Sequence, residues 1–177
     1  MDLPEFVMLA AGTLCILVFT WQFSVKAGRY HGVYRFFSFE SILILFLLNW
    51  RTWFNEPLSW HQIISWILLM GSILPAVEGF RLLRSVGKPA GQFEATTHLV
   101  TTGVYKHIRH PLYASLVLLG LGIFLKQVSS SGAILAFINT LAITLTAKRE
   151  EKEMIVKFGS EYRVYMQHSK MFIPYVV

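Results

Sequence analysis

The stretch GVYKHIRHPLY (Gly103–Tyr113) places a lysine, an arginine and two histidines in the five positions before Pro111, and the apolar run LYASLVLLGLGIFL begins at the residue after this proline. Proline fits the first turn of a helix, because its missing N–H has no intrahelical partner there. The backbone N–H groups that follow attract anions such as carboxylate or phosphate. The stretch therefore predicts a helix that begins at Pro111, with a polar site where this helix enters the lipid.

The composition is that of an integral membrane protein with an all-α fold. Of the 177 residues, 54% are hydrophobic and 15% are charged, whereas soluble domains average about 25% charged residues. The net charge of +6 comes from basic residues that flank apolar blocks, which indicates membrane topology rather than nucleic-acid binding. The single cysteine, Cys15, excludes a disulfide within the chain and argues against a cysteine-based zinc site.

Five apolar segments approach the length of about 20 helical residues that crosses a bilayer. We therefore expect about five transmembrane helices, of which the last two form a C-terminal hairpin joined by KQVSSSG. We interpret the first segment as a retained helix, because it has no basic stretch before it and no small-residue cleavage site after it. The expected helices cover approximately residues 4–23, 36–54, 58–80, 111–125 and 132–147.

The basic residues predict how these helices are oriented. If the N-terminus faces outside, all of the 16 Lys and Arg residues except Arg51 and Lys126 face the cytoplasm. GVYKHIRHPLY and the polar C-terminal tail then lie on the same, cytoplasmic side. Because two polar segments on one side of a helical membrane protein can meet, we predict the functional site there.

The tail KREEKEMIVKFGSEYRVY (residues 148–165) is predicted to be helical and cytoplasmic. Its apolar residues recur three or four positions apart, so that one side of a helix can be buried. We expect the fifth helix to continue to about Phe158, and Gly159 to divide the tail into two helices.

The polar motifs have structural interpretations as well as functional ones. Arg109 suits either an anion site or anchoring at the membrane interface. Glu150 and Glu151 suit either salt bridges on a helix surface or a site that holds a hydroxyl or amine, or accepts a proton. His107 and His110 are three residues apart but lack the further ligands that a metal needs, so we predict no metal site.

The order of these motifs resembles that of the isoprenylcysteine carboxyl methyltransferase and phospholipid methyltransferase superfamily. The likeness rests on HLVTTGVYKHIRHPLYAS, a helical hairpin, REEKEMIVKFGSEYRVY and a closing Pro174, and it covers about residues 92–174. The resemblance implies a membrane enzyme that transfers a methyl group from S-adenosylmethionine, with S-adenosylhomocysteine as product. The acceptor would be a lipophilic small molecule or a lipidated molecule from the bilayer. Membrane lipids are expected partners, and nucleic acid is not; the oligomeric state stays open.

The resemblance also implies a set of site residues, and together with the apolar segments it gives a domain organisation. We expect one membrane domain over residues 1–177, with three transmembrane helices in residues 1–80 and the catalytic region in residues 81–177. The expected catalytic residues are Glu150, which would face the acceptor, and Arg149. The expected cofactor-binding residues are Gln92, His98, Leu99, Val100, Tyr105, Arg109, His110, Pro111, Leu112, Tyr113 and Glu151.

Two positions depart from the family pattern. The family often has histidine two residues before the leucine of the Leu-Val pair, where this chain has Thr97. Family members commonly use an arginine for the acceptor thirteen residues before the glycine of Phe-Gly, and that position is Thr146 here. Arg149 is one of the two basic residues nearby that could substitute for it.

Two other classes of protein compete with this interpretation. Membrane sterol reductases resemble the family in their C-terminal region and use NADPH. A non-enzymatic membrane scaffold or transporter subunit would carry charges along a path through the bilayer. The helix centres in this sequence are nearly free of charge, which argues against the second alternative.

Overall fold

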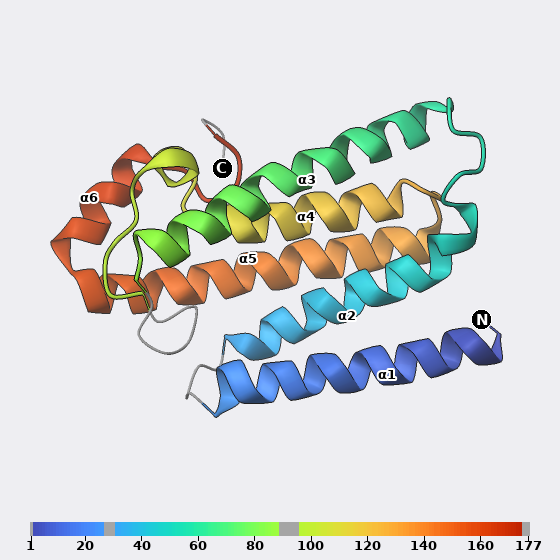
Figure 1. Cartoon of the computed structure of the whole chain (residues 1–177), viewed down its shortest axis with the longest axis horizontal. Helices are drawn as coiled ribbons and strands as arrows, with labels where there is room; N and C mark the ends of the chain where they lie inside the picture. The colour runs from blue at the N-terminus through green and yellow to red at the C-terminus, as the bar shows by residue number, and fades with distance from the viewer. Residues whose placement is uncertain (1, 27–30, 89–95, 175–177) are drawn as a thin grey trace. The chain divides into compact units, whose positions relative to one another are not determined.

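The computed structural model describes residues 2–26, 31–88 and 96–174, and within these ranges the regular structure is helical (Figure 1). The predicted all-α class is confirmed; the described part of the chain contains one isolated bridge, between Ile108 and Lys170, and no strand. The elements are α1 (Leu3–Thr20), η1 (Trp21–Val25), α2 (Gly32–Asn49), η2 (Trp50–Thr52), α3 (Trp60–Ser85), η3 (Gly103–Lys106), α4 (Pro111–Phe124), α5 (Ser130–Phe158) and α6 (Ser160–His168).

Four helical stretches are long and apolar enough to cross a membrane, which supports an integral membrane protein. They are Leu3–Ser24, Gly32–Thr52, Trp60–Ser85 and Ser130–Phe158. The fifth predicted span, α4, is apolar but has only 14 residues. Many large apolar side chains on these helices are exposed, as expected of surfaces that face lipid. The direction in which the helices cross the membrane stays a prediction.

Local sequence signals predicted several helix ends correctly. α4 begins at Pro111, and α5 continues to Phe158, as expected. Gly159 follows with φ of 61°, a backbone conformation that side chains other than hydrogen disfavour. The chain turns there, so α6 does not continue the axis of α5 (Figure 1).

The third predicted helix is longer than expected, and the second is displaced. α3 runs to Ser85 rather than to residue 80, and Pro75 lies inside it without ending it. In lipid no water can satisfy backbone groups that leave a helix, so a proline is more easily tolerated than a break. α2 begins at Gly32, ends at Asn49, and passes into the short η2 helix.

The chain folds into two compact units. The first contains residues 1–70 and 116–146, and the second contains residues 71–115 and 147–177. Three helices, α3, α4 and α5, therefore contribute residues to both units. The expectation of a single domain stays a prediction.

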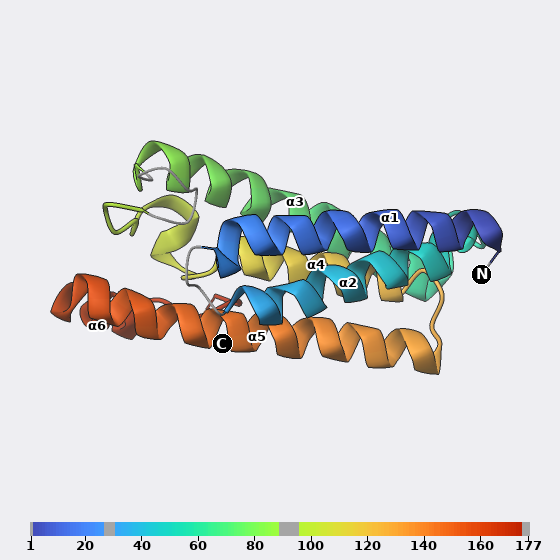
Figure 2. The ribbon, with the colours of Figure 1, turned by 90° about the horizontal axis from the view of Figure 1, so that it is seen from below.

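The first unit has a small apolar core to which four helices each contribute one side chain. These are Leu45 of α2, Leu69 of α3, Ile123 of α4 and Ala136 of α5. In Figure 2 the parts of α4 and α5 in this unit run antiparallel and are joined by a short connection. The predicted hairpin is thus present.

Hydrogen bonds between helices supplement this core. Asn139 of α5 donates from Nδ2 to the carbonyl oxygen of Leu116 over 3.1 Å, and its Oδ1 accepts from Ser38 Oγ over 2.6 Å. Asn139 and Ser38 are fully buried. Such bonds matter in a membrane, because lipid offers no hydrophobic driving force between helices. A Cβ atom on Gly120 would lie 2.2 Å from Asn139 Nδ2, so this glycine permits the contact.

We predict that Gly120→Ala destabilises the first unit by about 1–3 kcal/mol, because the new methyl group displaces a buried amide that is held at both ends. Gly71→Ala is the matched control, since a Cβ on Gly71 meets no atom within 4 Å. The thermal unfolding midpoint in detergent measures both effects. Combining Gly120→Ala with Asn139→Ala should cost less than the sum of the two single changes. Equal tolerance of alanine at the two glycines would contradict this packing.

Candidate active site

The candidate site forms in the second unit around the first turn of α4. The carbonyl oxygen of His110 accepts the first helical hydrogen bond, from the N–H of Ala114 over 2.9 Å, so His110 caps the helix. Pro111 follows as its first residue and is fully buried. The N–H groups of a helical first turn have no acceptor within their own helix and carry the positive end of the helix dipole. This geometry suits an anionic group.

Two carboxylates of α5 meet the arginine and the histidine that precede α4. Arg109 Nε lies 2.7 Å from Glu151 Oε1, and both side chains are about 10% exposed. His110 lies between the acidic neighbours, with Nδ1 3.7 Å from Glu150 Oε2 and Nε2 3.4 Å from Glu151 Oε1. The structure therefore brings together four of the predicted site residues from segments that are about 40 positions apart in sequence.

His110 is the member of this cluster whose bonding is incomplete. Its side chain is buried, and Nε2 has no hydrogen-bond partner in the described part of the chain; the contact with Glu151 lacks hydrogen-bond geometry. The imidazole stacks on Tyr113, with ring centroids 5.5 Å apart and planes 17° apart. A buried polar atom without a partner costs about 1–3 kcal/mol, so its retention suggests that a ligand completes the bonding.

The C-terminal segment after α6 completes the cluster through contacts that were not predicted from the sequence. The N–H of Arg109 donates to the carbonyl oxygen of Lys170 over 2.7 Å, and the N–H of His110 donates to that of Met171 over 3.2 Å. Arg109 Nη1 also donates to the carbonyl oxygens of Ser169 and Met166. Two of the three guanidinium nitrogens of Arg109 are thus committed to protein acceptors.

Three buried or half-buried tyrosines surround the cluster. The hydroxyl of Tyr165 donates a hydrogen bond to the carbonyl oxygen of Tyr105 over 2.6 Å. The hydroxyl of Tyr105 in turn donates to the carbonyl oxygen of Gly79 over 3.4 Å. Burial, followed by the nearby charge of Glu150, raises the pKa of Tyr105 above its ordinary value. Burial also raises the pKa of Tyr162 and Tyr165. All three phenols therefore stay protonated at neutral pH and can act as hydrogen-bond donors.

The other predicted cofactor residues lie near α4 or on the loop before it. Val100 is buried, Leu99 and Leu112 are half-buried, and His98 is exposed, with Nδ1 2.9 Å from Thr97 Oγ1. Gln92 lies outside the described residues.

Arg149 and Thr146 of α5 make none of the contacts that form the cluster. Arg149 is exposed, whereas the adjacent Glu150 is half-buried and Glu151 is buried. Because a helix turns about 100° per residue, Arg149 and Glu151 point in nearly opposite directions. Thr146, in the position of the family arginine, is buried and donates from Oγ1 to the carbonyl oxygen of Ala142 over 2.8 Å.

Two charged residues that were not predicted to belong to the site hold the loop before α4. Glu78 of α3 accepts a hydrogen bond from the N–H of Val104 over 3.2 Å. Lys157 of α5 donates to the carbonyl oxygen of Thr96. The sequence did not predict these contacts, because each joins a helix to a loop residue more than 20 positions away.

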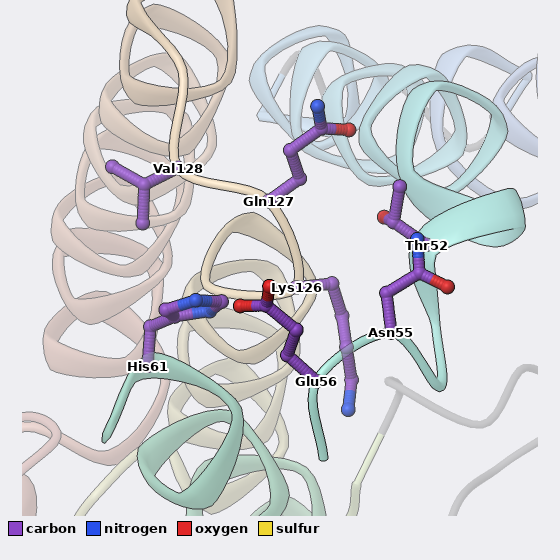
Figure 3. Close-up of a pocket in the computed structure, with 7 residues that line it drawn as sticks. All are labelled: Thr52, Asn55, Glu56, His61, Lys126, Gln127 and Val128. Carbon is purple, nitrogen blue, oxygen red and sulfur yellow. The ribbon is translucent and has the colours of Figure 1, made fainter. Parts of the chain in front are cut away.

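A separate polar hollow of about 640 Å³ lies in the first unit (Figure 3). Lys126, which is only 1% exposed, is one of the residues that line it. The Nζ atom of Lys126 lies 3.0 Å from Gln62 Oε1 and 3.5 Å from the centre of the Trp66 ring. Burial lowers the pKa of this lysine. None of the predicted site residues lines the hollow. The lining residues are Thr52, Asn55, Glu56, His61, Lys126, Gln127 and Val128.

The fold is that of a helical membrane protein, and its second unit contains a buried polar cluster. The family model "Phospholipid methyltransferase" matches residues 60–161, which is more than half of the chain. The chain therefore belongs to the phospholipid methyltransferase family, as the sequence motifs indicated. This family membership supports a membrane methyltransferase.

One curated relative is methanethiol S-methyltransferase 1 of Bradyrhizobium diazoefficiens. The two sequences are 28% identical over 169 residues, which cover 88% of this chain and 58% of the relative. The chain thus spans somewhat more than half the length of this relative.

We predict that Arg109→Gln loosens the C-terminal segment, because it removes the ion pair with Glu151 and the bonds to the Ser169 and Met166 carbonyls. A charged hydrogen bond contributes about 1.5–3 kcal/mol, so cleavage after Lys170 by a lysine-specific protease should accelerate by about tenfold or more. Arg163→Gln, an exposed change on α6, is the control. Equal cleavage rates in the two variants would show that Arg109 does not hold the segment.

Proposed function

We propose that the protein is an S-adenosylmethionine-dependent methyltransferase that acts on a lipophilic acceptor at the membrane. The observation that carries this proposal is the cluster of His110, Glu150 and Glu151 at the start of α4, in which His110 Nε2 is buried without a hydrogen-bond partner among the described residues. Membership of the phospholipid methyltransferase family and the relative with a methyltransferase name support the same reaction class.

The residues of the cluster fit the polar groups of S-adenosylmethionine. The cofactor carries a carboxylate, an ammonium group and a positively charged sulfonium. The N–H groups at the start of α4 suit the carboxylate, and the two glutamates suit the positive groups. Tyr105, Tyr113 and Val100 offer buried apolar surface for the adenine and ribose, with Leu99 at their edge.

When bound, S-adenosylmethionine supplies a methyl group that its sulfonium activates for transfer. The work of this chain is then alignment, which can account for several kcal/mol of the barrier. Glu150 is the more exposed of the two glutamates, and its position suits orientation of the acceptor or removal of its proton. Glu151 is held by Arg109, so these two residues position the cluster.

Within this proposal, Arg109 acts through Glu151 and the C-terminal segment rather than as a free anion-binding fork. Its Nε and Nη1 atoms already have protein acceptors. Arg149 would have to act on a part of the acceptor that lies outside the cluster, because its side chain is exposed.

The acceptor is proposed by class only. A prenylcysteine carboxylate, a phospholipid amine, and a lipophilic thiol, amine or acid all suit methyl transfer from a sulfonium. The neutral hydroxyl of Thr146, bonded within its own helix, does not replace the family arginine as a carboxylate ligand, which favours an amine or thiol. The curated relative, named for a thiol, is consistent with this preference. By the distribution of basic residues, the site faces the cytoplasm.

We predict that His110→Ala and Glu150→Gln each reduce methyl transfer by about a hundredfold or more, because each removes a group from the reacting cluster. Transfer is measured with methyl-labelled S-adenosylmethionine and a mixture of membrane lipids and small lipophilic thiols and amines. Glu161→Gln, an exposed change on α6, should retain activity.

Cofactor binding provides the second measurement for this proposal. Equilibrium binding of labelled S-adenosylmethionine should be detectable in the wild type and weakened in His110→Ala, while NADPH should not compete. Competition by NADPH would favour a reductase. Normal turnover in both cluster variants would remove these residues from the mechanism.

A further inference from the structure

A second hollow, in the second unit, lies apart from the carboxylate cluster. Its volume is about 800 Å³, and it is formed by the C-terminal half of α3 with one residue of α4, Leu112, as the opposite wall. The α3 residues that line it are Ala76, Val77, Phe80, Arg81, Arg84 and Ser85. They form neighbouring pairs that repeat every four positions, so they share one face of that helix.

The inner part of this hollow is apolar and belongs to a helix that can cross the membrane. Val77 is 61% exposed and Phe80 is 45% exposed, although both lie within the span Trp60–Ser85. Exposed apolar side chains on such a helix are expected to contact lipid chains rather than water. The hollow therefore has the surface of an acyl-chain site.

Arg81 and Arg84 line the far end of the hollow with the apolar parts of their side chains, because almost no polar surface faces it. Arg81 and Arg84 are exposed and three residues apart, at the end of the span. Among the residues that the structure describes, no acidic side chain forms a salt bridge with either guanidinium. Ser85 Oγ already donates to the carbonyl oxygen of Arg81 over 2.8 Å, so the two guanidinium groups are the remaining side-chain donors among the lining residues. Two adjacent guanidinium groups at the membrane boundary match a phosphate, which accepts paired N–H bonds.

We propose that this hollow binds one anionic phospholipid, with its phosphate at Arg81 and Arg84 and an acyl chain along Val77, Phe80 and Leu112. A free phosphate would leave the apolar wall uncovered, and the phosphate of a zwitterionic lipid would be offset by the lipid's own ammonium group, so its attraction to the two positive charges would be weaker. The lipid is a bound component of the protein and not the methyl acceptor, so the proposal does not depend on the proposed function.

The test uses the full chain, purified in detergent and incubated with equal amounts of phosphatidylglycerol and phosphatidylcholine. Native mass spectrometry counts the lipids that stay bound. The wild type should retain phosphatidylglycerol in preference to phosphatidylcholine. In Arg81→Gln/Arg84→Gln this preference should fall about tenfold or more. The matched control, Lys152→Gln/Arg163→Gln, removes two exposed charges of the same unit and should keep the preference.

A second variant tests the apolar wall separately. Ala76→Trp fills the hollow and leaves both arginines in place, so it should also lose the bound lipid. Size-exclusion profiles and circular dichroism establish that each variant is folded. Retention of phosphatidylglycerol by the double arginine variant, or equal loss in its control, overturns the proposal. The proposal is also overturned if Ala76→Trp retains phosphatidylglycerol, or if inorganic phosphate displaces the lipid. Either result would show that surface charge alone holds the lipid.

Discussion

The ion pair between Arg109 and Glu151 joins three segments of the second unit: the loop before α4, the cytoplasm-directed end of α5 in the predicted orientation, and the C-terminal segment after α6. The pair is nearly buried, and isolated buried charges are costly. Arg109 lowers this cost by donating further hydrogen bonds to the Ser169 and Met166 carbonyls. The same contacts fix the backbone of the next residue, His110, against Met171.

Once these contacts are formed, the geometry of the candidate site follows from helix structure. Glu150 and Glu151 are consecutive on α5, and His110 stands between their carboxylates as the cap of α4. The N–H groups in the first turn of α4 have no acceptor within their own helix and carry the positive end of the helix dipole, which favours an anion. Negative side chains and a positive helix end thus lie side by side. This arrangement suits a ligand that carries charges of both signs, as S-adenosylmethionine does.

The sequence predicted the parts of this structure that depend on local signals. Pro111 and Gly159 act through their own backbone preferences, so the start of α4 and the end of α5 were predictable. The hydrogen bond from Arg109 to Ser169 was not predictable, because a contact between residues about 60 positions apart leaves no periodic pattern in the sequence. Family resemblance supplied Glu150 and Arg149 together, but in the structure Arg149 is exposed whereas Glu150 is half-buried. For Lys126 the sequence predicted a place in the hairpin turn on the outer side of the membrane, but not its burial against Trp66, which depends on tertiary packing.

The most direct test of the account is amide hydrogen exchange of the full chain in detergent, with and without S-adenosylhomocysteine. Binding at the cluster should slow exchange in residues 98–110 and in the C-terminal segment 169–172, which pair through Arg109 and His110. Exchange in the loops around the polar hollow of the first unit, residues 52–61 and 126–128, should stay the same. Protection confined to those loops, or no protection at residues 98–110, would contradict a cofactor site at the start of α4.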